Sequence, residues 1–206
     1  MLKVHYFFDP MCGWCYAASS LVEVLANMQA FEILYHPGGM IPKRAIEPSF
    51  RQHILQADKR ITEMTKVPFG DHYIARVKGP EEYVVDSLLP TQAMIAGEKM
   101  GIDRHTMLVA LQQAHYQEGK HLHEPEVLTE LATSLGLDKA EWEKTMTQSS
   151  HAMKSEITQS RQLMSQMQVS GFPTFILEKD VTWMPLSHSA FYGKPAEWKA
   201  YLSNLL

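Results

Sequence analysis

Cys12 and Cys15 are the only cysteines in this chain of 206 residues, and they stand three positions apart in the segment DPMCGWCYA. The residues after Cys12 repeat apolar side chains at helical spacing, so Cys12 lies at the start of a predicted helix. Unpartnered backbone N–H groups at a helix start stabilise a thiolate, which is the form of cysteine that attacks disulfides. We therefore expect Cys12 to attack. Cys15, one helical turn deeper, can close a disulfide with Cys12 and release a bound partner.

Two other interpretations of this pair are a metal site and an inert structural pair. A tetrahedral zinc site takes four ligands. Because the chain has two cysteines, the other ligands would have to come from histidines such as His5 or His36, or from another chain. No second cysteine pair with metal-ligand spacing follows in the sequence. Redox chemistry is therefore favoured over both alternatives, and no metal is expected.

The elements on either side of the pair predict how it is positioned. Residues 2–8, LKVHYFF, are rich in β-branched and aromatic side chains and predict a buried strand that ends at Asp9 and Pro10. A helical pattern over residues 13–28 and a second strand over residues 31–38 follow. The cysteine pair is thus expected at a junction between a strand and a helix.

The rest of the chain is mostly helical before it returns to strands. Residues 40–86 combine a helix near 48–65 with a loop that contains several Pro and Gly residues. The elements expected after residue 87 are helices at 88–101, 103–119, 124–136 and 138–168, strands at 174–180 and 181–187 that form a hairpin, and a terminal helix at 195–206. The pattern over 138–168 fits one long helix or two shorter ones.

A second feature stands far downstream, in the segment VSGFPTFIL. Pro173 directly precedes a predicted strand, and proline cannot donate a hydrogen bond to a sheet. A cis Phe172–Pro173 bond would turn the chain so that its backbone faces the cysteine pair and offers an edge to an extended peptide. A trans bond in a turn is the commoner arrangement, and the residues alone leave both open.

With CGWC and GFPTF together, the sequence resembles the thioredoxin superfamily, and within it the DsbA-like branch that includes FrnE-type proteins and kappa-class glutathione transferases. The resemblance covers essentially the whole chain. It implies an α/β protein with a thioredoxin fold and an inserted α-helical domain. The implied division is a thioredoxin-like domain over residues 1–40 and 155–206 and a helical insertion over residues 41–154.

The resemblance also implies roles for single residues. Cys12 matches the family's nucleophile, Cys15 its resolving cysteine, and Pro173 the cis-proline that faces them. The expected substrate-binding residues are Trp14, Phe172, Pro173 and Thr174. Phe172 is bulkier than the small β-branched residue that usually precedes this proline in relatives, which would change the groove that holds the substrate.

These features predict an enzyme, a thiol–disulfide oxidoreductase that reduces or isomerises disulfides of proteins or small molecules. The alternatives are a glutathione-dependent transferase or isomerase of the kappa-class type, and a redox sensor without turnover. Kappa-type proteins use a serine-type site at this junction, whereas this chain has both cysteines. No bound cofactor is expected, and glutathione remains a candidate thiol partner.

Composition limits the partners and the surroundings. The formal net charge is −4 and the 19 basic residues are scattered, so nucleic acid is not an expected partner. No run of about 18 apolar residues predicts a membrane span. The first residues lack a secretory signal, so a cytoplasmic location is expected, where thiols stay reduced and the enzyme would work as a reductase or isomerase. The sequence carries no signal for an oligomeric state.

Three histidines, His115, His121 and His123, stand close together in the segment HYQEGKHLHE. Gly119 interrupts the helical periodicity between them, so no single helix face presents all three. A solvated loop is therefore favoured over a metal site.

Asp9 and several methionines have weaker claims to a role in the site. Asp9 is expected to serve the local turn rather than to accept a proton from Cys15. Most of the 13 methionines are expected in the core. The candidates for a surface that accommodates a peptide are Met11, Met164, Met167 and Met184.

Overall fold

A four-stranded sheet forms the base of the protein in the computed structural model, which describes residues 1–180 and 182–206. Its strand order is β2-β1-β5-β6. The strands are β1 (Leu2–Phe8), β2 (Phe31–Pro37), β5 (Thr174–Lys179) and β6 (Thr182–Pro185). β1 pairs with β2 in parallel and with β5 antiparallel, and β6 pairs antiparallel with β5. β1 is central, which explains its continuous run of buried apolar residues.

Helices at the two ends of the chain cover the sheet face that carries Tyr6 and Phe175. They are α1 (Gly13–Ala17), α2 (Ser19–Ala26) and α9 (Pro195–Ser203), the last preceded by a short 3₁₀ turn, η1 (His188–Phe191). Trp198 of α9 is fully buried, packs on Phe175, and donates from Nε1 to the Leu21 carbonyl at 3.1 Å. This contact joins α9 to α2 over the sheet.

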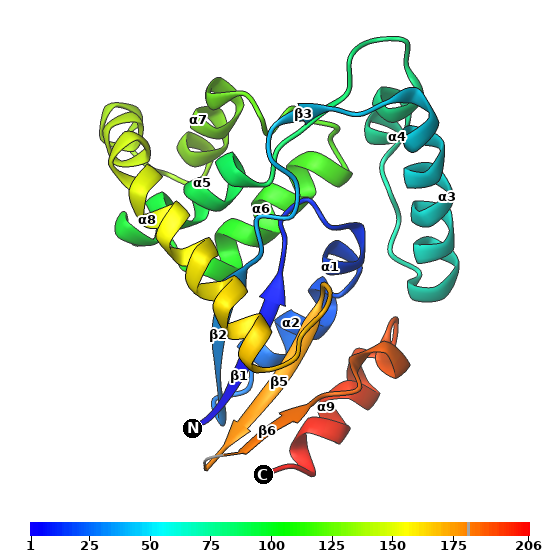
Figure 1. Ribbon diagram of the computed structural model, residues 1–206, viewed down its shortest axis with the longest axis vertical. Coiled ribbons are helices and arrows are strands. Elements are labelled where there is room, and N and C mark those ends of the chain that lie inside the picture. Colours follow the sequence, from blue (N-terminus) through cyan, green and yellow to red (C-terminus); the bar gives the residue numbers. More distant parts are fainter. Residues whose placement is uncertain (181) are drawn as a thin grey trace.

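The segment between β2 and β5 adds a helical block. It contains a two-stranded ribbon of β3 (Arg44–Ala45) and β4 (Val84–Val85), and the helices α3 (Pro48–Thr65), α4 (Asp71–Lys78), α5 (Leu88–Lys99), α6 (Arg104–Tyr116), α7 (Pro125–Ser134) and α8 (Lys139–Gln166). In Figure 1, α3 and α4 lie on one side of the end of β1, α5, α7 and α8 lie on the other, and α6 runs across between them toward α4. The end of β1 and α1 therefore lie between two helical groups.

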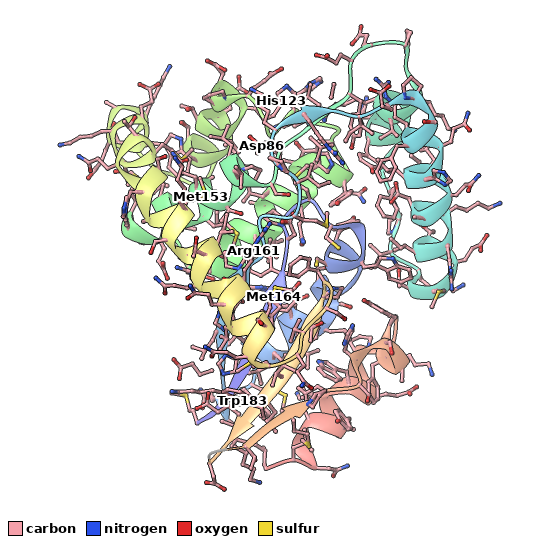
Figure 2. The ribbon with its side chains drawn as sticks, in the orientation of Figure 1. Asp86, His123, Met153, Arg161, Met164 and Trp183 are labelled. Carbon is pink, nitrogen blue, oxygen red and sulfur yellow. The ribbon has the colours of Figure 1, made fainter. Side chains whose placement is uncertain are left out.

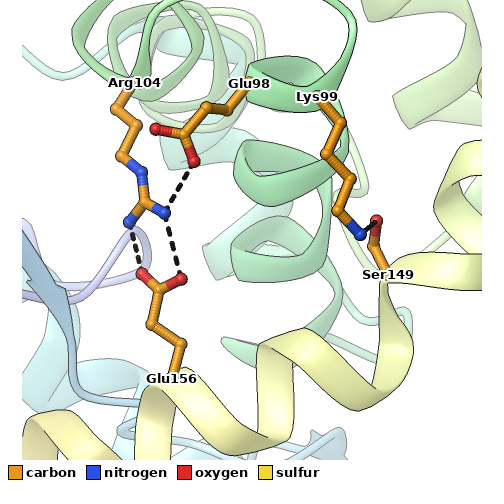
Figure 3. Close-up of polar contacts among 5 residues, drawn as sticks. All are labelled: Glu98, Lys99, Arg104, Ser149 and Glu156. Atoms are coloured by element: carbon orange, nitrogen blue, oxygen red, sulfur yellow. Dashed lines mark hydrogen bonds and ion pairs between the residues drawn. The ribbon is translucent and has the colours of Figure 1, made fainter.

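Charged side chains tie α8 to the helices beside it (Figure 3). Arg104, at the start of α6, donates to both carboxylate oxygens of Glu156 in α8 and to Glu98 in α5 at 2.7 Å. Lys99 of α5 donates to Ser149 of α8 at 3.0 Å. Because Arg104 is mostly buried and paired with two carboxylates, this network fixes the relative position of three helices.

Most of the expected elements are confirmed. The α/β architecture and the helical block are present, and residues 139–166 form one helix rather than two. The expectation of one helix over 13–28 is wrong in detail, because the helix is interrupted at Ala18. The expected loop also contains α4 and the β3–β4 ribbon, which are too short to show a clear periodicity.

The last strand is shorter than expected, and the expected domain boundary falls within a helix. The strand expected at 181–187 includes Val181, which lies outside the described residues, and the strand itself spans Thr182–Pro185. The expected boundary between residues 154 and 155 falls inside α8, so one continuous helix serves both parts. The division stays a prediction. No helix in the described part of the chain is long and apolar enough to cross a membrane.

Candidate active site

The two cysteines lie where β1 ends and α1 begins, as expected. Cys12 is the N-cap residue of α1, and its backbone N–H donates to the Asp9 carbonyl at 3.1 Å. The N–H groups of Cys15 and Tyr16 donate to the Cys12 carbonyl at 3.0 Å, which closes the first helical turn. Cys12 is 8% exposed and Cys15 is fully buried, and both are free thiols. Only the first cysteine is thus accessible to a substrate.

The surroundings shift the pKa values of the two thiols in opposite directions. A hydrogen bond from the Cys15 side chain lowers the pKa of Cys12, and the backbone N–H groups of Cys15 and Trp14 add to this effect against the cost of burial. Burial raises the pKa of Cys15 well above its usual value, and its hydrogen bond to Cys12 adds to the rise. The pair therefore holds one proton on Cys15 and favours a thiolate on Cys12.

The loop before β5 faces the outer thiol. The Phe172–Pro173 peptide bond is cis, as the resemblance implies. The Sγ atom of Cys12 lies 3.8 Å from the carbonyl oxygen of Phe172, to which it donates when it is protonated. Two segments 160 residues apart in the sequence thus meet at the thiol.

The bulk of Phe172 is accommodated by a glycine at the end of β2. A methyl group added to Gly38 would lie 1.9 Å from Cζ of the Phe172 ring, so the ring occupies the space that any larger residue would need. Arg161 of α8 fixes the same segment, because its guanidinium donates to the carbonyls of Gly38 at 2.9 Å and Gly39 at 2.6 Å. The position of the Phe172 carbonyl beside Cys12 is therefore set by packing.

A cavity of about 430 Å³ opens next to Phe172. It is lined by Gly38, Met40, Arg161, Met164, Ser165, Val169 and Phe172. Figure 2 shows Arg161 and Met164 on the same stretch of α8. Of the four methionines singled out from the sequence, Met164 lines this cavity, Met11 is buried, Met167 is the half-buried C-cap residue of α8, and Met184 is 40% exposed on β6.

Asp9 is a buried hub behind the cysteines. One carboxylate oxygen accepts from the Met11 N–H at 2.9 Å and the Ser87 hydroxyl at 2.7 Å, and the other accepts from the Met40 N–H at 2.6 Å. Burial raises its pKa, and these three donors oppose the rise. Asp9 thus joins the turn after β1, the loop after β2 and the start of α5, which is a wider role than the expected local turn.

Asp58 of α3 is a second buried carboxyl at the site, and sequence reasoning missed it. A methyl group added to Gly13, between the two cysteines, would lie 3.3 Å from Asp58 Oδ1 and 3.2 Å from Ile61 Cδ1. The Tyr73 hydroxyl donates to Asp58 Oδ2 at 2.9 Å. Burial raises the pKa of Asp58 to about 7. The one available signal was an acid on the apolar face of a predicted helix.

The other expected site residues lie around this centre. Pro173 is buried, and Trp14 is half-buried with its ring centroid 5.7 Å from that of Tyr192. The Thr174 hydroxyl donates to the Gly171 carbonyl at 2.8 Å and so closes its own turn. His5 and His36 contact each other at 2.9 Å, with Glu178 beside His5 at 2.8 Å, and these contacts involve neither cysteine.

This geometry defines a thioredoxin-type dithiol site, and comparison with known proteins agrees with it. The family model for the DSBA-like thioredoxin domain matches residues 3–192. The structure is similar to that of the cytosolic disulfide reductase DsbM from Pseudomonas aeruginosa, with 34% sequence identity, a TM-score of 0.91, and coverage of 99% of this chain and 98% of that one. The structure of DsbM with GSH matches with 33% identity, a TM-score of 0.90 and the same coverage.

A more distant match shows the shared fold alone. DsbA from Pseudomonas aeruginosa has 19% identity and a TM-score of 0.57, with 98% of this chain and 80% of that chain covered. The chain belongs to the DsbA-like thioredoxin family. Together with its paired cysteines, this makes it a thiol–disulfide oxidoreductase, so the expected fold and class of enzyme are confirmed.

Proposed function

We propose that the protein reduces disulfide bonds with Cys12 as the nucleophile and Cys15 as the resolving cysteine, and that glutathione restores the dithiol. The asymmetry of the two thiols carries this proposal. Cys12 reaches the surface and has a lowered pKa, whereas Cys15 is buried and has a raised pKa. One thiol is therefore ready to attack, and the other keeps its proton until it is needed.

The reaction proceeds in two exchanges. The Cys12 thiolate attacks one sulfur of a substrate disulfide, a bond forms between Cys12 and that sulfur, and the other substrate sulfur leaves as a thiolate that takes up a proton. Cys15 then loses its proton and attacks the Cys12 sulfur. This step forms the Cys12–Cys15 disulfide and releases the second substrate thiol. Two glutathione molecules then reduce the enzyme disulfide and leave as one glutathione disulfide.

The segment around Phe172 supports the assignment of substrate contacts. The Phe172 carbonyl lies beside Cys12 Sγ, and the neighbouring cavity offers apolar and polar walls to the residues that flank a half-cystine. We assign Phe172 and Pro173 to substrate binding on this basis, with Trp14 at the edge toward Tyr192. Thr174 is kept as a positioning residue, because its hydroxyl is used within the turn.

We propose that the enzyme works in the direction of disulfide reduction and that it acts in the cytoplasm. The support is the similarity to DsbM, which is described as a cytosolic disulfide reductase and whose structure was determined with GSH. Proteins or small molecules with disulfides are the proposed substrates. We retain residues 1–40 and 155–206 as the proposed thioredoxin-like part and 41–154 as the helical insertion that covers the dithiol from the side of α3.

The direct test is a trapping experiment with single-cysteine variants. C15S should accumulate a mixed disulfide between Cys12 and glutathione when mixed with glutathione disulfide, and C12S should not, as read by intact-protein mass. In both variants the rate of glutathione-coupled insulin reduction should fall at least about a hundredfold. Full turnover by C15S would instead favour a single-thiol reaction of the transferase type.

The lowered pKa of Cys12 can be tested separately, through the pH dependence of the rate at which its thiol is alkylated. The rate of Cys12 alkylation by iodoacetamide should reach half its maximum below pH 8.5, the ordinary value for a cysteine thiol. C15A should move this midpoint upward, because it removes the hydrogen bond that lowers the pKa of Cys12. An unchanged midpoint in C15A would show that Cys15 does not activate Cys12.

A further inference from the structure

The loop between α6 and α7 gathers three side chains that the dithiol chemistry does not use. They are His121, His123 and Glu124, each of which offers one ligand atom, and these atoms all lie within 4.8 Å of one another. From the sequence, Gly119 was expected to keep His115, His121 and His123 off a single helix face, and a solvated loop was favoured over a metal site. In the structure His115 is buried in α6, whereas a turn in the loop after α6 brings His121 and His123 together, with their ring centroids 5.6 Å apart.

The turn has a clear physical cause. The Glu124 N–H donates to the His121 carbonyl at 3.0 Å, which folds the segment back on itself. Leu122, between the histidines, is 1% exposed and anchors the turn in the core. The two flanking imidazoles are only partly exposed, at 40% for His121 and 12% for His123.

We propose that His121, His123 and Glu124 bind a divalent transition-metal ion of the zinc type, with a further position open to water. Glu124 Oε1 lies 3.6 Å from His121 Nδ1 and 3.7 Å from His123 Nε2. These distances are too long for hydrogen bonds. They are close to the separation of about 3.4 Å between two ligands of a tetrahedral zinc ion with bonds of about 2.1 Å. Small side-chain rotations would complete the site.

The backbone that carries these ligands is already held in place. Arg76 of α4 donates to the Lys120 carbonyl at 2.7 Å and to the Gly119 carbonyl at 3.2 Å. The Lys120 N–H donates to the Ala114 carbonyl at 2.8 Å, and Lys43 donates to the His123 carbonyl at 3.3 Å. A loop fixed in this way loses little further freedom when an ion binds, which favours binding.

The charges around the site favour one class of ion. A neutral imidazole nitrogen binds a metal ion through its lone pair and needs no negative charge on the ligand. The positive charges of Arg76 and Lys43 also repel a cation, so an ion held by charge alone would bind weakly here. Calcium and magnesium depend on several oxygen ligands, whereas zinc, copper and nickel bind imidazole well. The site therefore suits the second group.

The proposed metal site and the dithiol share no residue. Neither Cys12 nor Cys15 belongs to the group of three ligands. Figure 2 shows His123 near the edge of the helical block, at the opposite end of the molecule from Trp183. A bound ion would hold together the two ends of the turn that precedes α7 and so stabilise the folded chain by mass action.

The test is zinc titration of the untagged protein with its Cys12–Cys15 disulfide formed, so that no thiol can bind the ion. We expect one ion per chain by calorimetry and a zinc-dependent rise of the melting temperature. H121A and H123A should each weaken binding at least about tenfold and abolish the rise, and E124Q should weaken binding less. H53A, which removes an exposed histidine of α3, is the matched control and should bind as the parent does.

Several outcomes would overturn the proposal. They are the absence of binding heat, equal loss in H53A and H123A, or unchanged binding in H121A and H123A. Binding seen only after reduction of the disulfide would assign the ion to the cysteines and contradict the proposal. Circular dichroism of each variant without zinc checks its fold, and H121A serves if H123A fails to fold, because His121 is the more exposed ligand.

Discussion

The two sides of the dithiol are built differently. On the side of the sheet, the polar groups are fully engaged, since Asp9 accepts three hydrogen bonds and Arg161 holds the carbonyls of Gly38 and Gly39. On the side of α3, Asp58 accepts one hydrogen bond, from Tyr73, among the residues that the structure describes. Both carboxyls are nearly or wholly buried.

This difference gives the two carboxyls different roles, one in positioning the site and the other in its response to pH. Three donors stabilise the charged form of Asp9 and resist the effect of burial on its pKa. Burial still raises the pKa of Asp9, and at Asp58, which has one donor, burial raises the pKa to about 7. We infer that the sheet side fixes the position of Cys12 relative to Phe172, whereas the α3 side places a group that changes charge near neutral pH beside Gly13.

The largest expected effect on disulfide reduction is on the sheet side, from G38A. The added methyl group would fall 1.9 Å from the Phe172 ring, so the ring and its carbonyl beside Cys12 must move. We expect a loss of about 1 to 3 kcal/mol in the free energy of unfolding, by chemical denaturation, and a loss of most disulfide reduction.

A double variant tests whether the clash with the Phe172 ring causes the losses in G38A. G38A combined with F172V should recover stability and activity relative to G38A, because the smaller side chain vacates the space. If G38A reduces disulfides as well as the parent does, the packing of Phe172 on Gly38 does not position the site.

D9N should come next, with its main effect on stability. The substitution places an amide where a carboxylate accepts three hydrogen bonds, so at least one buried donor loses its partner. We expect a loss of about 2 to 3 kcal/mol in the free energy of unfolding. S87A removes one of the three donors and should cost less, and equal losses in the two variants would contradict the role of Asp9 as a hub.

D58N should have an effect that depends on pH. The pKa of Asp58 is raised in the folded protein, so its contribution to stability is intact below about pH 4 and is lost as the pH rises through about 7. The parent should therefore lose about 2 to 4 kcal/mol between pH 4 and pH 8 that D58N does not lose. Denaturation at several pH values measures this, and parallel pH profiles of the two proteins would rule it out.

The smallest effect is expected for G13A on the α3 side. The added methyl group would meet Ile61 Cδ1 at 3.2 Å and Asp58 Oδ1 at 3.3 Å, which small side-chain shifts can relieve. We expect a loss below about 1 kcal/mol in the free energy of unfolding, compared directly with G38A. A larger loss in G13A than in G38A would reverse the proposed division between the two sides.

Local patterns were sufficient for the dithiol and for most helices and strands. Cys12 at the end of β1 follows from an apolar strand, a turn at Asp9 and Pro10, and a helical pattern that begins directly afterwards. The helices α3, α7 and α9 each begin with proline in the first turn, which is also a local signal. Such signals depend on residues that are close together in the sequence, so they can be recognised without the structure.

Contacts between distant segments had no comparable signal. The fit of Phe172 against Gly38 and the position of Asp58 against Gly13 depend on how the chain folds back on itself. The convergence of His121 with Glu124 is local, because the two residues are three positions apart. Neither the spacing of the histidines nor the interruption at Gly119 predicted that a turn would bring them together.

The sequence by itself determined the chemistry available at the site, because two thiols one helical turn apart at a strand–helix junction can exchange disulfides wherever the chain places them. The tertiary structure alone decided how far each thiol is buried, which carbonyl oxygen lies beside Cys12 and which buried acids surround the pair. Burial and long-range packing set these properties, and both arise only when segments far apart in the sequence exclude water together.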